Sequence, residues 1–228
     1  MSTHAQEPAQ EHAQHHAPTR TESVATPAGE ARITWHTART ARLVLALGHG
    51  AGGGIEARDL QALAAALPAR GITVALVEQP WRVAGKKVAA APKVLDQGWH
   101  GLWPALTAPG LPVVAGGRSA GARVACRTAA GLGAAGVLAL AFPLHPPGRP
   151  ERSRAGELTG AGVPTLVVQG GRDAFGRPGE FPEGTFELVE VEAADHGMAV
   201  PKKAPLTQEE ALEVITGAVG DWLGRLAS

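Results

Sequence analysis

The sequence predicts an α/β protein with a doubly wound, mostly parallel sheet and helices on both faces. Apolar runs that end near glycine alternate with segments of helical periodicity from about residue 31 onward. Strands that alternate with helices form parallel sheets covered by those helices. The chain shows no internal repeat and no second core. Residues 31–228 are therefore expected to fold as one domain.

The expected strands share unbroken or alternating runs of apolar side chains, which are typical of strands in a sheet. They cover residues 42–48, 72–80, 111–117, 136–143, 163–170 and 186–193. The last run alternates between apolar and polar residues, which indicates a strand near the edge of the sheet.

Three segments have the periodicity of amphipathic helices. They cover residues 56–71, 119–130 and 207–226. The first ends at Gly71, a residue type that favours helix C-termini. The last begins with capping-box spacing from Thr207 to Glu210. The stretch 81–110 shows no regular pattern.

Residues 1–30 are predicted to be a disordered tail. They are rich in Ala, Gln, His, Pro and Thr, so burial of apolar surface cannot offset the entropy of ordering them. Four of the nine histidines lie there: His4, His12, His15 and His16. A metal-binding tail is the alternative, but the lack of supporting Cys or carboxylate ligands favours a solvated arm. The segment has no apolar signal region, so we expect a cytoplasmic protein.

Composition excludes several classes of partner. The 21 basic and 21 acidic residues cancel, which argues against binding to nucleic acid or to an anionic membrane. No stretch approaches the roughly 18 apolar residues of a membrane span. The single cysteine, Cys126, excludes an internal disulfide and a Cys-based zinc site. We expect no metal site, and the oligomeric state stays open.

Chemistry-bearing segments follow four of the expected strands. They are "GHGAGGG" (48–54), "GGRSAG" (116–121), "QGGRDAFG" (169–176) and "ADHGM" (194–198). In doubly wound sheets, sites form in the loops at the carboxyl ends of the strands. Two histidines, a serine and an aspartate are therefore expected along one rim.

Residues 117–121 match the G-x-S-x-G pattern of a nucleophile elbow. Such a turn holds Ser119 in a strained conformation, so the residues two positions before and after it must be small. The Ser119 hydroxyl then projects above the sheet. The N–H of Ala120, at the start of the next helix, would stabilise an oxyanion. The alternative is an ordinary turn in which Ser119 caps the helix. The position between a buried strand and a helix favours the elbow.

Asp173 and His196 are the expected partners of Ser119. They follow it in the order nucleophile, acid, histidine, and each follows a strand. Asp173 alone would indicate an Asx-turn and His196 alone an exposed loop histidine, but the coincidence of all three favours a triad. Asp195 is a rival acid. Adjacent residues seldom orient their side chains toward each other in this way, so Asp173 is preferred.

The segment "HGAGGG" (49–54) can supply backbone N–H groups that converge on a negative oxygen. We assign the second oxyanion donor to Ala51, with Gly52 as the nearest alternative. The segment lacks the Gly-Lys-Ser/Thr ending of a phosphate-binding loop and the G-x-G-x-x-G pattern of a dinucleotide site. No cofactor is expected.

Together, "GHGAGGG", "GGRSAGARVA", "FPLHPPGRPERSR", "QGGRDAFG" and "DHG" resemble the α/β hydrolase superfamily over residues 32–226. They are most similar to its small cap-less, dienelactone-hydrolase-like branch, which includes the hydrolase-like domain of a testis-expressed protein and of a histone-acetyltransferase-complex subunit. The resemblance implies an eight-stranded or slightly smaller sheet and a triad of Ser119, His196 and Asp173. Dienelactone hydrolases proper use a cysteine nucleophile, so their substrates are not implied, and some relatives serve as scaffolds.

About 20 residues separate the strands at 136–143 and 163–170, too few for a lid domain, so the site is expected to be open and shallow. Gly52, Trp81, Leu144 and His145 are expected to line the substrate pocket. The alternative for Trp81, as for Trp99 and Trp103 in neighbouring expected loops, is packing. For His145 it is bracing of its loop.

These observations favour a serine hydrolase, specifically a carboxylesterase that cleaves small to medium acyl esters through an acyl-enzyme. Its partner would be a small-molecule ester. A non-catalytic interaction domain on the same fold is the alternative, as is a peptidase or thioesterase with the same triad, because fold alone does not determine activity.

Overall fold

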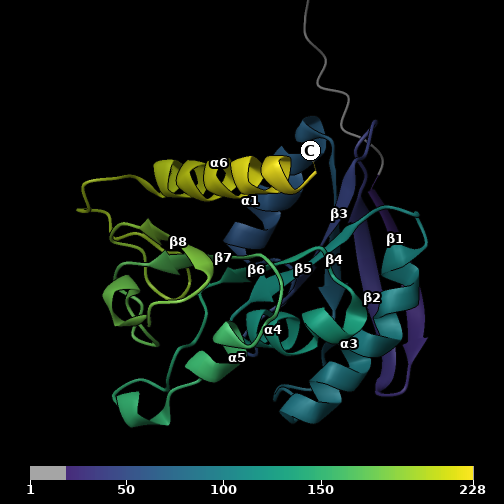
Figure 1. Ribbon diagram of the computed structural model, residues 1–228, viewed down its shortest axis with the longest axis horizontal. Coiled ribbons are helices and arrows are strands. Elements are labelled where there is room, and N and C mark those ends of the chain that lie inside the picture. The colour runs from purple at the N-terminus through teal and green to yellow at the C-terminus, as the bar shows by residue number, and fades with distance from the viewer. Residues whose placement is uncertain (1–18, 228) are drawn as a thin grey trace, which may run out of the picture.

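A computed structural model describes residues 19–227 and contains one eight-stranded sheet in the order β1-β2-β4-β3-β5-β6-β7-β8 (Figure 1). The strands are β1 (Thr19–Thr26), β2 (Gly29–His36), β3 (Leu43–Gly48), β4 (Ile72–Glu78), β5 (Val113–Arg118), β6 (Gly136–Leu140), β7 (Thr165–Gly170) and β8 (Phe186–Val191). Strand β2 pairs antiparallel with β1 and with β4, and every other pair is parallel. The predicted α/β class with a mostly parallel sheet is confirmed.

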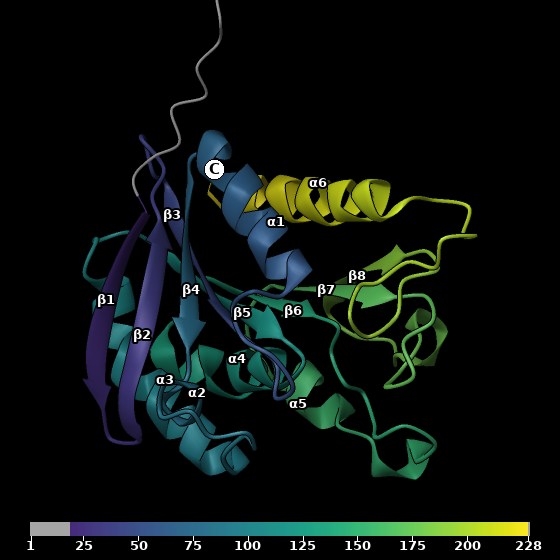
Figure 2. The same ribbon diagram turned by 180° about the vertical axis from the view of Figure 1, so that it is seen from behind.

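Helices cover both faces of the sheet (Figures 1 and 2). They are α1 (Arg58–Ala66), α2 (Pro80–Val83), α3 (Pro92–Thr107), α4 (Ala120–Leu132), α5 (Ala155–Thr159) and α6 (Gln208–Leu226), with short 3-10 turns η1 (Leu67–Arg70), η2 (Pro150–Arg152) and η3 (Pro178–Glu180). Helices α1 and α6 lie on one face, and α3, α4 and α5 lie on the other.

The central strands are buried on both faces because their side chains point alternately to each side. In β3, Val44 and Ala46 pack in the apolar cluster beneath α3 and α4. Leu43, Leu45 and Leu47 pack in the cluster beneath α1 and α6. This two-sided burial explains why the strand has an unbroken apolar sequence.

The predicted disordered tail of residues 1–30 is wrong for residues 19–30. Strand β1 and the start of β2 occupy this stretch as an antiparallel hairpin at one edge of the sheet. Most β1 side chains are exposed, so the strand is held mainly by backbone pairing with β2, while Val24 packs against the core. The Trp35 indole of β2 donates to Glu22 Oε2 at 3.2 Å. Residues 1–18 of the predicted tail, with their four histidines, lie outside the described residues.

The structure also differs from the expectation of an irregular stretch at 81–110, because α3 is a 16-residue helix. It carries Trp99 and Trp103 as buried side chains, not as loop residues. The sequence pattern does not predict this helix, because Pro104 and two glycines are residues that usually interrupt helices. Those glycines make close contacts: a Cβ at Gly98 would lie 2.8 Å from Gln79 Oε1, and one at Gly101 would lie 2.7 Å from Thr26 Cβ.

The connection from β6 to β7 holds η2 and α5, with no further domain inserted between these described strands. This agrees with the prediction that the fold carries no lid domain. Among residues 19–227, no helix is both long and apolar enough to cross a bilayer.

Candidate active site

Ser119 occupies a sharp turn between β5 and α4. Its backbone has φ 53° and ψ −109°, a conformation that non-glycine residues rarely adopt and that costs about 1–3 kcal/mol. The Ser119 N–H donates to the Leu140 carbonyl of the neighbouring strand β6 at 2.9 Å. The turn is therefore tied to the sheet on one side and continues directly into a helix on the other.

The glycines on each side of Ser119 allow the turn to pack against the end of β3. A Cβ at Gly117 would lie 2.6 Å from the Gly48 carbonyl oxygen. A Cβ at Gly121 would overlap the same carbonyl and lie 3.0 Å from His49 O. Backbone atoms cannot rotate away as a side chain can, so both positions require glycine.

The structure brings Ser119, His196 and Asp173 into one hydrogen-bonded line. Ser119 Oγ lies 2.9 Å from His196 Nε2, and His196 Nδ1 lies 2.7 Å from Asp173 Oδ2. Asp173 is fully buried, and the His196 side chain is 22% exposed, so solvent reaches the ring but not the carboxylate.

The surroundings of Asp173 determine which nitrogen of His196 carries the proton. Its Oδ1 accepts the Phe175 N–H at 2.8 Å, and its Oδ2 accepts from Gln169 Nε2 at 2.9 Å. An ionised carboxylate can only accept hydrogen bonds, so the His196 proton lies on Nδ1. The Nε2 lone pair then faces the Ser119 hydroxyl and accepts its hydrogen.

The rival acid, Asp195, forms hydrogen bonds within its own loop. Its Oδ1 accepts the N–H groups of Gly197 at 2.7 Å and Ala199 at 2.9 Å, which shapes the loop that carries His196. Arg118 supports the same loop, because its guanidinium donates to the His196 carbonyl. The Arg118 guanidinium also pairs with the fully buried Asp59 at 3.2 Å.

The loop after β3 lies directly beside the elbow. A Cβ at Gly50 would lie 3.4 Å from Ser119 Cβ. Within residues 19–227, the amides of Ala51 and Ala120 donate no hydrogen bond to the protein. Both are therefore free to bind an oxygen atom of a ligand, as the predicted oxyanion roles require.

The His49 side chain stabilises this loop through two hydrogen bonds. Its Nε2 accepts the Gln79 N–H at 3.2 Å, so the proton lies on Nδ1, which donates to the Gly50 carbonyl at 2.9 Å. Burial lowers the pKa of His49, which keeps the ring neutral at pH 7. A neutral ring preserves both hydrogen bonds and places no positive charge under the loop.

Sequence reasoning missed two residues that contact the predicted triad. The Phe175 ring stacks on the His196 ring with centroids 4.2 Å apart. Gln169, fully buried, holds Asp173 and also donates to the Gly176 carbonyl at 2.8 Å. Each lies within four residues of Asp173. An aromatic and an amide side chain so close to the expected acid could have indicated that they support it.

The four predicted pocket residues lie in different places. Trp81 lines a small cavity beside Ala120. Gly52 is exposed next to the Ala51 amide. Leu144 is buried beneath Gly176 and belongs to the apolar core, so it does not line the site.

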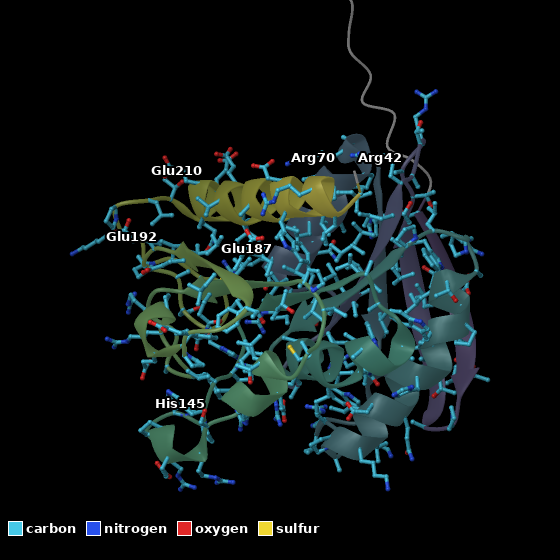
Figure 3. All side chains as sticks on the ribbon, viewed as in Figure 1. Arg42, Arg70, His145, Glu187, Glu192 and Glu210 are labelled. Atoms are coloured by element: carbon cyan, nitrogen blue, oxygen red, sulfur yellow. The ribbon has the colours of Figure 1, made fainter. Side chains whose placement is uncertain are left out.

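His145 contacts the loop that carries Phe175 and does not contact the predicted triad. Its backbone N–H donates to the Phe175 carbonyl at 2.9 Å, and its ring Nε2 lies 3.4 Å from Glu180 Oε1. Figure 3 shows it on the side of the sheet opposite α6. These contacts fit the alternative role, that of bracing the loop that carries Phe175.

Cys126 packs in the core of α4, as the sequence predicts. Burial raises the pKa of its thiol to about 12, so the thiol is not a nucleophile at neutral pH. Across residues 19–227, no three His, Cys, Asp or Glu side chains gather closely enough to hold a metal ion.

Several solved structures share this fold. A lidless α/β serine hydrolase from Xanthomonas campestris, XC6422, is 18% identical with a TM-score of 0.66, over 90% of this chain and 94% of that one. Dienelactone hydrolase from Anabaena variabilis is 18% identical with a TM-score of 0.70, over 92% and 99%. Est1E from Butyrivibrio proteoclasticus is 13% identical with a TM-score of 0.67, over 90% and 98%. A search of curated proteins finds no match.

These likenesses concern the fold, since all three identities are below 25%. The sequence itself adds a match to the model of the α/β hydrolase domain over residues 39–224. That span runs from the residues before β3 to the last turn of α6 and includes every residue of the Ser119–His196–Asp173 line. The chain therefore belongs to the α/β hydrolase family.

Proposed function

We propose that the protein is a serine hydrolase that acts as a carboxylesterase on small to medium acyl esters. The continuous hydrogen-bonded line from Ser119 Oγ through His196 to Asp173, at 2.9 Å and 2.7 Å, carries this proposal. The line ends on a serine in a strained turn, and such strain clusters at functional sites.

In the proposed reaction, Ser119 Oγ attacks the ester carbonyl while His196 Nε2 takes its proton. His196 then gives that proton to the leaving alcohol, and the acyl group stays bonded to Ser119 as an ester. Water, deprotonated by the same nitrogen, releases the acid. Throughout, Asp173 holds the imidazole in its Nδ1–H tautomer and stabilises the charged ring.

The tetrahedral intermediates carry a negative oxygen, which needs donors already in place. The unpaired amides of Ala51 and Ala120 are proposed for this task. Ala120 follows Ser119 directly, and Ala51 follows Gly50, where a Cβ would lie 3.4 Å from Ser119 Cβ. The strained turn supports this role because it places the Ala120 N–H at the start of α4, where helix amides have no partner within the helix.

A fluorophosphonate probe tests the proposal, because it bonds covalently to an activated serine. We expect the wild-type protein to be labelled and Ser119→Ala to stay unlabelled. Turnover of p-nitrophenyl esters should fall about 10⁴- to 10⁶-fold in Ser119→Ala, the scale of triad knockouts. The matched control is Ser153→Ala, a loop serine on the short segment between η2 and α5, which should be labelled like the wild type.

A folded wild-type protein that resists labelling and hydrolyses no ester would contradict the proposal and favour an interaction domain on the same fold. Circular dichroism on the same samples checks that both variants are folded.

A further inference from the structure

We propose that Trp81 is a wall that restricts the acyl group to about the size of acetyl, so the substrates are acetyl esters. The inference deepens the proposed esterase function and rests on it. It comes from two cavities that both have Trp81 in their lining.

The first cavity lies beside the elbow and is very small. Its volume is about 10 Å³, and its walls include Ala120, one of the two proposed oxyanion donors, and Gly50, which precedes the other donor, Ala51. Space of roughly 10–15 Å³ accommodates one water molecule, and a methyl group is of similar size. Val124, Leu95 and Trp81 also line it and give it apolar walls against which a short acyl group could pack.

The second cavity is much larger, with a volume of about 190 Å³. It lies between the β1–β2 turn, α2 and the start of α3, and Ala28, Val83 and Val94 contribute apolar surface. An apolar cavity of about 150 Å³ accommodates a benzene ring. This space would therefore hold a six-carbon acyl chain, if such a chain could enter it from the elbow.

The two cavities share three lining residues: Gln79, Trp81 and Leu95. The Trp81 side chain is 6% exposed and meets the His49 ring edge-to-face, with centroids 5.4 Å apart. That contact holds the indole against the floor of the proposed oxyanion loop. Because Trp81 lines both spaces, the proposed wall separates the larger one from the small cavity beside Ala120.

Gln79 supports a fixed position for this wall. It precedes α2 directly, its N–H is bound to His49, and its Nε2 lies 3.4 Å from the Leu95 carbonyl. Its Oε1 is buried with no hydrogen-bond partner among the described residues. Removal of the Trp81 indole would join the cavities.

The test compares kcat/KM for p-nitrophenyl acetate and hexanoate within each preparation, so the active fraction cancels. The wild type should favour acetate at least tenfold, since one methylene that does not fit changes kcat/KM roughly 10- to 200-fold. Trp81→Ala should lower the acetate-to-hexanoate ratio at least tenfold, and Trp81→Leu should lower it by less. Trp81→Leu also keeps the test valid if Trp81→Ala fails to fold.

Trp103→Ala is the matched control, because Trp103 is a buried tryptophan of α3 that lines neither cavity. Its ratio should equal the wild-type ratio within twofold. A wild type that is labelled at Ser119 but hydrolyses hexanoate as well as acetate overturns the wall and leaves the esterase function standing. An unchanged ratio in both Trp81 variants overturns it as well. Loss of labelling and of all turnover in the wild type would overturn both proposals.

Discussion

The conformation of Ser119 depends on the absence of side chains at two neighbouring positions. Gly117 and Gly121 let the turn approach the end of β3, and the atoms they approach belong to the Gly48 backbone. A methyl group added at either glycine would therefore displace the turn, and with it the Ser119 hydroxyl that contacts His196. Strain of this kind persists only where the surrounding structure holds it in place.

Gly121→Ala should disturb this turn strongly. The new Cβ overlaps the Gly48 carbonyl, so α4 or the loop after β3 must move. A displacement of about 1 Å in an active site can cost about 10²-fold in rate, and we expect at least that loss in fluorophosphonate labelling rate. Overpacking should also lower the free energy of unfolding by about 1–3 kcal/mol, measured by urea denaturation.

Gly131→Ala on the same helix separates this clash from helix propensity. Its Cβ would meet nothing within 4 Å. The variant should gain up to about 1 kcal/mol in stability and be labelled at the wild-type rate. Wild-type labelling and stability in Gly121→Ala would show that the close approach does not constrain the elbow.

At the scale of elements, α6 anchors the loop that carries His196. The Gln208 side chain, in the first turn of α6, donates to the Met198 carbonyl at 2.9 Å and accepts the Val200 N–H at 3.1 Å. The helix start is itself defined by a capping box between Thr207 and Glu210. Glu210 is labelled in Figure 3, at the start of α6. The position of the histidine loop thus depends on where this helix begins.

Thr207→Ala should weaken that start. The Thr207 hydroxyl accepts the Glu210 N–H at 3.2 Å, and loss of such an N-cap costs about 1 kcal/mol of unfolding free energy. Urea denaturation measures the change. Thr216→Ala, in the middle of α6, should leave stability unchanged or slightly raised, because alanine is the better helix former. Equal stabilities of the two variants would contradict a capping role.

At the scale of the whole molecule, the sheet joins two apolar cores. Trp35, Trp81, Trp99 and Trp103 belong to the core beneath α3 and α4, whereas Trp222 belongs to the core beneath α1 and α6. Each central strand contributes side chains to both cores. Loss of one helical layer would therefore expose strands on which the other layer depends.

We expect both layers to unfold in one transition. In Trp222→Phe, tryptophan fluorescence reports the core beneath α3 and α4 alone, while far-UV circular dichroism reports both layers. The two urea transitions should have the same midpoint. Two separate steps in circular dichroism, with a single step in fluorescence, would show that α1 and α6 unfold independently.

Much of this fold could be predicted because the pattern of apolar residues along the chain reflects which side chains are buried. The strands from β3 to β8 and the start of α6 follow from apolar runs and from the Thr207–Glu210 spacing. Strand β1 and helix α3 could not be predicted in this way. The first is polar and held by its partner strand, and the second contains residues that local rules count as breakers.

The sequence by itself determined the fold class and the candidate residues Ser119, Asp173 and His196, because the order of loops after parallel strands follows from the order of the chain. Their catalytic roles remain predictions. The sequence favoured Asp173 over Asp195, but only the tertiary structure showed that Asp173 contacts the His196 ring, that Phe175 and Gln169 contact this pair, and that Trp81 lines two cavities. These are contacts between residues far apart in the chain or depend on side-chain direction, and neither is encoded in local periodicity.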